Sequence, residues 1–194
     1  MSEPTRADAW ELLCEWTESD SLRKHALAVE ASMRLYAGVW GEDEERYAIT
    51  GLVHDLDYER FPDLETGHPR MGMAELERLG YPRDVIDAVA GYAECLELPR
   101  ESRLAKTLYA VDELSGFVTA CALVRPTGIE GMKVKSVRKK LKTPAFAAKV
   151  DRGQIERGIA ELDVDETEHI QRVIDALSGE AEALGISAAQ VAGG

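Results

Sequence analysis

The sequence predicts an all-α fold, a single-domain helical bundle. Apolar residues recur every three or four positions rather than alternating, and this spacing is typical of amphipathic helices. Residues that cap helix N-termini, such as Ser19 and Asp20, stand directly before such stretches. The chain has 194 residues, 45% of them hydrophobic, which suits one buried core and is too apolar for a disordered protein.

The first two thirds of the chain divide into helical stretches separated by turn residues. A helix is expected over residues 6–16, and a second opens after Ser19 and Asp20 with His25 and Val29 on its apolar face. Gly41 separates the second helix from a third. The remaining expected elements of this region are a helix over residues 44–54, a loop over 56–67, and helices over 69–79, 83–93 and 101–123.

The last third is also expected to be helical. Asp151 with Gln154, and Asp163 with Glu166, have capping-box spacing, so a helix should begin just after each aspartate. The second of these helices should run to about residue 184. We therefore expect a helical domain over residues 1–185 and a frayed C-terminal tail over residues 186–194.

Composition excludes several classes of protein. Lys and Arg number 23 against 36 Asp and Glu, and the net charge of −13 disfavours non-specific nucleic-acid binding. The longest apolar stretch, residues 117–124, is far shorter than the roughly 20 residues of a membrane span. The polar start has no signal-peptide pattern, and three scattered cysteines fit neither a disulfide framework nor a zinc ribbon. A cytoplasmic protein with no membrane partner is expected.

One segment departs from the acidic composition. Residues 133–142 carry six positive charges, including Lys135. The segment can be read as a solvated helix face beside acidic neighbours. It can also be read as a cationic rim that attracts a phosphorylated substrate.

Two histidines and an aspartate lie within apolar helix faces. His25 and His54 share faces with apolar residues, Asp55 follows His54 directly, and Asp112 stands beside an apolar stripe. A carboxylate at such a position is costly unless a positive group meets it. Each residue alone has a structural explanation, as a hydrogen-bonded core histidine, a chance dipeptide or a helix cap. Together, the imidazoles and carboxylates from separate helices could share one divalent metal ion.

The sequence around these residues resembles a known family. It reads RKHALAVE around His25, GLVHDLDY around His54 and Asp55, and YAVDELSG around Asp112. This H…HD…D order is similar to that of the HD-domain superfamily of metal-dependent phosphohydrolases, and most closely to small bacterial HD hydrolases. The resemblance implies an HD-type helical bundle in which His25, His54, Asp55 and Asp112 hold one divalent ion (Mn, Co, Ni, Fe, Zn or Mg).

The chain also departs from the family pattern. Members with two metal ions have additional histidines between the HD pair and the last aspartate, whereas this interval contains only His68. Tyr92 stands where close relatives suggest a histidine, and the lysine that often follows the HD pair is missing. One metal ion is therefore expected rather than two.

The resemblance implies a metal-dependent hydrolase that cleaves a phosphate ester with metal-activated water as the nucleophile. The substrate would be a small phosphorylated metabolite or a nucleotide. Asp57, on a loop free to face the cleft, and His68, at a helix start, are the candidates for proton transfer. Asp57 could instead cap a turn, and His68 could be an exposed residue. The candidates for binding the substrate phosphate are Arg23, Lys24, Lys106 and Lys135.

Two other functions are compatible with the same residues. A few HD-fold sites hold two irons and act as oxygenases, although the shortage of intervening histidines argues against this. A catalytically silent module that binds a metal or a ligand would keep the same fold. His169, on a late helix between Glu168 and Ile170, is expected at the surface.

Overall fold

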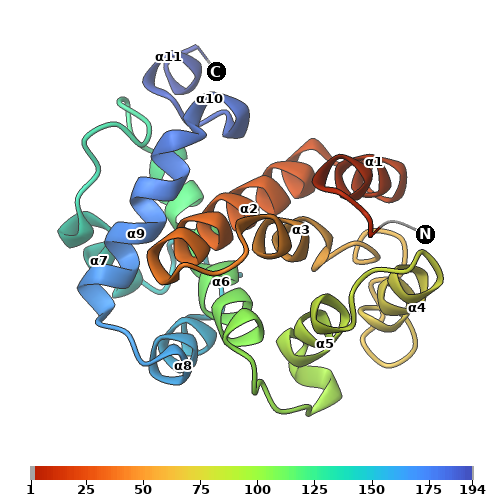
Figure 1. Ribbon diagram of the computed structural model, residues 1–194. Helices are drawn as coiled ribbons and strands as arrows, with labels where there is room; N and C mark the ends of the chain where they lie inside the picture. The colour runs from red at the N-terminus through yellow and green to blue at the C-terminus, as the bar shows by residue number, and fades with distance from the viewer. Residues whose placement is uncertain (1–2, 194) are drawn as a thin grey trace.

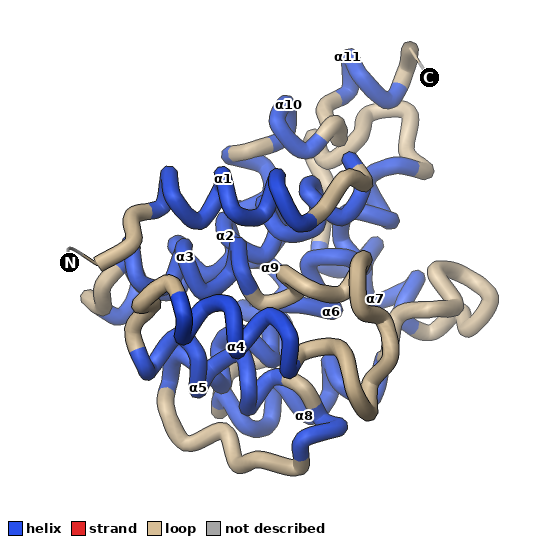
Figure 2. The backbone as a smooth tube through the Cα atoms, turned by 90° about the vertical axis from the view of Figure 1, so that its right-hand side faces the viewer, coloured by secondary structure: helices blue, strands red, loops and turns tan. Residues whose placement is uncertain are grey.

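A computed structural model describes residues 3–193 of the chain, which contain helices and loops and no strand (Figures 1 and 2). The predicted all-α class is confirmed. In chain order the elements are α1 (Arg6–Trp16), α2 (Asp20–Trp40), α3 (Glu44–Val53), α4 (Arg70–Arg78), α5 (Arg83–Tyr92), a 3-10 turn (Glu94–Leu96), α6 (Arg103–Leu123), α7 (Val134–Leu141), α8 (Arg152–Leu162), α9 (Glu166–Gly179), α10 (Ala181–Leu184) and α11 (Ala188–Val191). None of the helices within this part of the chain is long and apolar enough to cross a membrane.

Side-chain caps account for where the early helices begin. Ser19 accepts a hydrogen bond from the backbone of Leu22 at the start of α2, and Asp43 and Ser102 cap α3 and α6 in the same way. Each cap satisfies a backbone N–H group that has no partner inside its helix. The helices expected in the first two thirds of the sequence therefore begin within a few residues of their predicted positions.

The last third differs from the expected pattern at two helix ends. Asp163 does not begin a helix: it ends α8 in the left-handed conformation, with φ 55°. Asp165 is the residue that caps α9, by accepting from the backbone of Thr167 and Glu168. The expected continuous helix to residue 184 is interrupted at Glu180, which separates α9 from α10.

The segment expected to fray begins with a buried residue and contains a short helix. Ile186 is fully buried (0% exposed), and its carbonyl accepts a hydrogen bond from the backbone N–H of Ile129 at 2.9 Å. The short helix α11 follows it. A buried apolar side chain and a backbone pairing hold this segment against the body of the protein, and only Gly194 of the expected tail lies outside the described residues.

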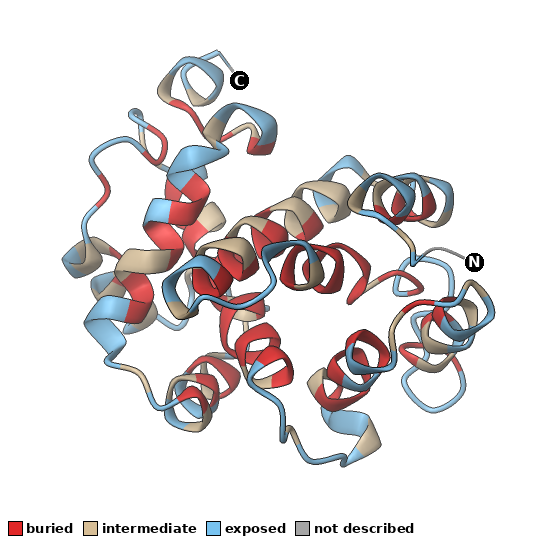
Figure 3. Cartoon of the chain, viewed as in Figure 1, coloured by how far each residue is buried: buried red, intermediate tan, exposed pale blue. Residues whose placement is uncertain are grey.

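Helix α6 is the centre of the architecture (Figure 1). It packs against α2, α5, α8 and α9, and buried residues line most of its length (Figure 3). One apolar cluster joins α6 to α2 and α9, and includes Met33, Phe117 and Val173. A second cluster joins α1, α3, α4 and α5. Helix α3 lies across α2 and connects the two clusters.

Two glycines allow helices to approach unusually closely. A Cβ atom on Gly51 of α3 would lie 2.8 Å from the Glu30 backbone of α2. A Cβ atom on Gly158 of α8 would lie 2.6 Å from Ala110 Cα of α6. Both distances are well inside normal contact, so any larger residue would push the helices apart.

The prediction that His169 lies at the surface is wrong. The side chain is fully buried (0% exposed), Nε2 donates to the Ala110 carbonyl at 3.0 Å, and Nδ1 accepts from the Tyr36 hydroxyl. His169 thereby joins α9 to both α6 and α2. It points inward with Ile170 and Val173 on the inner face of α9, a face that its exposed neighbour Glu168 does not share.

Substitution of the glycine at the α2–α3 contact should destabilise the fold. We expect Gly51→Ala to lower the free energy of unfolding by about 1–3 kcal/mol, because the Glu30 backbone cannot move aside. Gly38→Ala, in α2, is the matched control: the nearest atom to its added Cβ is a flexible Glu44 carboxylate oxygen at 3.4 Å. That substitution should stabilise by up to about 1 kcal/mol through helix propensity. Urea denaturation measures both, and equal effects would contradict the close-contact explanation.

The stability of the protein should depend on pH through His169. Burial lowers the pKa of His169 to about 4 from its ordinary value of 6.5. The unfolded chain therefore takes up a proton at a higher pH than the folded chain, and stability is lost as pH falls from about 6.5 towards 4. Between pH 7 and pH 5 this loss should be about 2 kcal/mol. His169→Gln should lack this part of the pH dependence, as measured by urea denaturation at each pH.

Candidate metal centre

Side chains from three helices converge beside the middle of α6. His25 of α2, and His54 and Asp55 at the end of α3, place one potential ligand atom each within 4.8 Å of one another. Asp112 of α6 joins them: its Oδ1 lies 2.9 Å from His25 Nε2 and 3.4 Å from His54 Nε2. Asp112 therefore lies against both histidines, beside the cluster that His25, His54 and Asp55 form.

His54 carries the feature that most directly indicates a cation. Its Nδ1 donates to the Gly51 carbonyl at 2.8 Å, which leaves Nε2 facing Asp55 Oδ2 at 3.5 Å and Asp112 Oδ1 at 3.4 Å. Nε2 is buried and has no hydrogen-bond partner. An imidazole lone pair between two carboxylates is unfavourable alone and is a suitable donor set for a divalent metal ion.

The charges around Asp112 are strongly coupled. Burial alone would raise the pKa of its carboxyl, but the hydrogen bond from His25 and the neighbouring His54 hold that pKa well below its usual range. Burial also opposes a charged His54, and the Asp55 and Asp112 carboxylates outweigh it and raise the pKa of His54. The pocket therefore strongly favours positive charge between its carboxylates.

A glutamine that the sequence did not single out for the site fixes the other oxygen of Asp112. Gln154 of α8 donates from Nε2 to Asp112 Oδ2 at 3.2 Å. It reaches this position because Gly158, one turn later on α8, lies directly against Ala110 of α6. The sequence indicated Gln154 only as the partner of Asp151 in a capping box, a pattern that gives no sign of its contact with Asp112.

Asp57 and His68 lie next to this cluster as a hydrogen-bonded pair. His68 Nδ1 donates to Asp57 Oδ1 at 2.7 Å, and the backbone N–H of Gly72 donates to Asp57 Oδ2 at 2.6 Å. Asp57 is 1% exposed, so the expectation that it freely faces the cleft is wrong: both its oxygens are occupied. His68 is buried too, and its Nε2 lies 3.6 Å from Asp55 Oδ1.

Tyr92 completes the surroundings of Asp55. Its hydroxyl donates to Asp55 Oδ1 at 3.2 Å, and its ring lies edge-on to His54 with centroids 5.2 Å apart. Burial raises the pKa of Tyr92 well above its ordinary value, so the hydroxyl keeps its proton. Tyr92 is therefore a hydroxyl donor to Asp55, one of the predicted ligands.

Comparison with known families agrees with this geometry. The family model described as HD domain matches residues 22–116, a range that contains His25, His54, Asp55 and Asp112. Residues 22–116 of this chain are an HD domain. The HD match ends within α6, whereas Gln154 comes from α8, beyond the matched range.

Similar proteins are known from several bacteria. A ribonuclease Y from Oleidesulfovibrio alaskensis is 32% identical over 98 residues, which are 50% of this chain and 18% of that relative. A ribonuclease Y from Thermus thermophilus is 30% identical over 103 residues, which are 53% of this chain and 16% of that relative. This chain thus spans less than a fifth of the length of these relatives. No solved structure matches it significantly.

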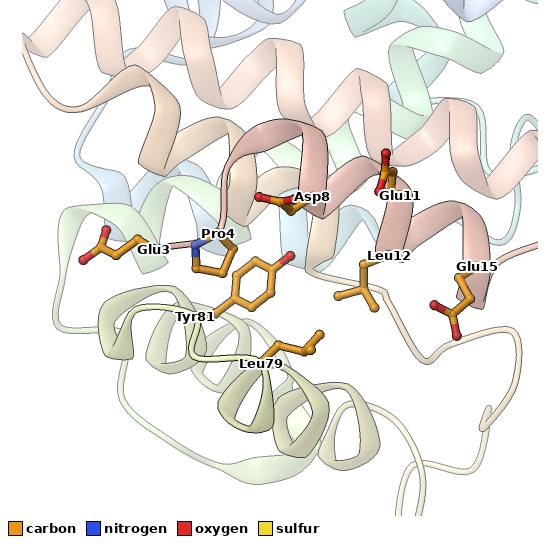
Figure 4. Close-up of a pocket in the computed structure, with 8 residues that line it drawn as sticks. All are labelled: Glu3, Pro4, Asp8, Glu11, Leu12, Glu15, Leu79 and Tyr81. Carbon is orange, nitrogen blue, oxygen red and sulfur yellow. The ribbon is translucent and has the colours of Figure 1, made fainter. Parts of the chain in front are cut away.

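Two hollows reach the HD cluster from different sides. One, of ≈ 200 Å³, is lined by His68, Tyr92 and Gln154 among others. The other, of ≈ 380 Å³, is lined by His25, Lys24 and Gly116 among others. A third hollow of ≈ 370 Å³ lies between α1 and the turn before α5, where Tyr81 is surrounded by acidic side chains (Figure 4), and no residue of the cluster lines it.

The basic residues predicted to bind phosphate are scattered. Arg23 is engaged elsewhere, since its guanidinium donates to the carbonyls of Thr17 and Cys14 and so secures the end of α1. Lys24 lines the hollow beside His25 but pairs with Asp20 at 2.7 Å. Lys106 and Lys135 line neither hollow at the cluster.

The contact between Gln154 and Asp112 should tune metal affinity. Groups that orient a ligand typically change metal affinity by about 10–100-fold when removed. We expect Gln154→Leu to weaken Mn²⁺ binding by at least about tenfold, measured by isothermal titration calorimetry on chelator-treated protein. Gln171→Leu, on α9, is the matched control, because Gln171 bonds only to Asp175 on its own helix. Equal affinities of the two variants would show that Gln154 has no effect on the ligands.

Proposed function

We propose that this HD-domain protein is a metal-dependent phosphohydrolase that cleaves a small phosphate ester. The observation that supports it most strongly is the unpartnered Nε2 of His54, which lies between the carboxylates of Asp55 and Asp112. His25, His54, Asp55 and Asp112 would hold one divalent ion. Bound there, the ion would lower the pKa of water and offset negative charge on the phosphoryl group.

The surroundings of Asp55 favour one ion over two. Asp55 Oδ2 faces His54, whereas Oδ1 accepts from Tyr92 and faces His68 Nε2. The Tyr92 hydroxyl thus occupies the oxygen that a second ion beside His68 would need. A buried tyrosine with a raised pKa is a poor ligand because it keeps its proton.

His68 is the group best placed to move a proton. The bond from its Nδ1 to Asp57 fixes the tautomer in which Nε2 has a free lone pair, and Nε2 faces Asp55 at the wall of the hollow. His68 Nε2 would accept a proton from the attacking water and return it to the leaving oxygen. Asp57 then acts as a positioning residue, since the Gly72 N–H occupies its second oxygen.

The substrate is proposed to be small rather than a nucleic acid. The relatives are named for a ribonuclease activity, but this chain covers less than a fifth of them. The net charge is −13, and the basic residues predicted to bind phosphate do not gather around the cluster. A polyanion needs several such cations, whereas one phosphate can rely mainly on the metal ion.

Hydrolysis of a panel of phosphate esters tests the proposal. The protein would be assayed with Mn, Co, Ni, Fe, Zn or Mg after chelation. His54→Ala should abolish turnover, and His68→Ala should lower kcat by about 10²–10⁴-fold because proton transfer is lost. Asp57→Asn should lower kcat less, because His68 remains but loses its fixed tautomer. Lys139→Ala, an exposed change on α7, serves as the control with unchanged turnover.

Metal analysis of the purified protein separates the alternatives. One redox-inert ion per chain, lost in His54→Ala, agrees with the proposal. Two irons per chain would instead favour an oxygenase. If the wild-type protein binds one ion but neither it nor His54→Ala hydrolyses any ester, a catalytically silent module would be favoured.

A further inference from the structure

The smaller of the two hollows at the HD cluster adjoins the cluster directly and is small. It opens onto the cluster, because His68 faces Asp55 and Gln154 contacts Asp112, and both residues line it. Its volume of ≈ 200 Å³ suits a ring system rather than an extended chain. Whatever occupies this hollow lies directly beside the phosphate that the cluster would process.

Two tyrosines and two apolar side chains, Leu64 and Ala93, form part of the walls of this hollow, beside polar residues such as His68 and Gln154. Tyr58 and Tyr92 line it, and each ring lies nearly perpendicular to His68 or His54. Leu64 stands at the rim. Tyr58 is 43% exposed and Leu64 52% exposed, so an uncovered apolar surface borders the opening. Aromatic side chains of this kind bind planar groups through their ring faces and edges.

The hollow is also poor in positive charge. Among its lining residues, all within the described part of the chain, there is no lysine or arginine, and Glu94 contributes a negative charge. The nearby Arg157 is neutralised by Glu94 at 2.9 Å and by Asp151 at 3.3 Å. A diphosphate or triphosphate in this hollow would meet no unpaired cation among the lining residues.

We infer that this hollow selects a planar aromatic group carried on a single phosphate, and that Tyr58 is a residue that determines specificity. The inference rests on the proposed hydrolase function. The phosphate would lie at the HD cluster and the ring would lie against Tyr58 and beside Leu64. Aromatic monophosphates should therefore be preferred over both alkyl monophosphates and nucleoside triphosphates.

The first experiment compares substrates. We expect adenosine 5′-monophosphate or 1-naphthyl phosphate to have a kcat/KM about tenfold above that of glycerol phosphate. Preference for one of the two identifies the ring as a nucleobase or as a simple aryl group. Tyr58→Ala should lower kcat/KM for the preferred ester, relative to kcat/KM for glycerol phosphate, about tenfold, mainly by raising KM for the preferred ester. Turnover without this discrimination would overturn the inference while leaving the hydrolase function standing.

The second experiment places a charge at the rim. Leu64→Lys should raise kcat/KM for adenosine triphosphate, relative to the monophosphate, about fivefold. Met71→Lys is the matched control: Met71 is exposed on α4 but does not line the hollow, so the same charge there should have no effect. Equal responses of the two variants would contradict the assignment of the ring site.

A binding measurement keeps the inference testable without turnover. Adenosine has no phosphate to lose, and it should bind the wild-type protein by calorimetric titration and bind Tyr58→Ala about tenfold more weakly. Equal binding of adenosine to both proteins would overturn the inference. So would a result in which neither protein binds adenosine and both bind 1-naphthol equally. If no ester is hydrolysed but adenosine binding depends on Tyr58, the proposed hydrolase function fails and the ring site stands.

Discussion

The burial of the Asp112 carboxylate is the constraint on which the rest of this site depends. A charged group inside a helical bundle is stable only when opposite charge or hydrogen bonds meet it. In this protein those partners come from α2, α3 and α8, none of which adjoins Asp112 in sequence. The contacts of the Asp112 side chain therefore link α6 to α2, α3 and α8. The close approaches at Gly51 and Gly158 are what allow these helices to reach it.

Two of the three carboxylates of the site, Asp112 and Asp57, are hydrogen-bonded at both oxygens, and Asp55 is hydrogen-bonded at one. Asp112 faces the histidines with one oxygen and Gln154 with the other. Asp57 faces His68 and the Gly72 backbone, and Asp55 faces His54 on one side and Tyr92 on the other. Such two-sided fixing removes rotational freedom before any ion or substrate arrives. The two oxygens of Asp55 also have different neighbours: Oδ2 faces His54, whereas Oδ1 accepts from Tyr92 and faces His68.

The parts of this structure that the sequence could predict are those encoded locally or by a motif. Helical periodicity and capping residues located most helices, and the H…HD…D order singled out His25, His54 and Asp55, which lie close together, and Asp112, which contacts both histidines. Contacts between distant segments were not predictable. Nothing near His169 in the sequence indicates its bonds to Tyr36 and Ala110, and nothing near Asp57 indicates that the Gly72 backbone, 15 residues later, occupies one of its oxygens. Asp163 was mistaken for a cap because it stands two residues before the real one, Asp165.

The contribution of α8 extends the site beyond the boundary of the family match at residue 116. The predicted ligands belong to the part of the chain that the family match covers, but the Gln154 amide that bonds to Asp112 belongs to a part that the match does not include. Two HD proteins with identical ligands can therefore differ in ion preference through a helix that no ligand motif reveals. Over evolutionary time, that helix offers a way to retune the centre while every residue that touches the ion stays the same.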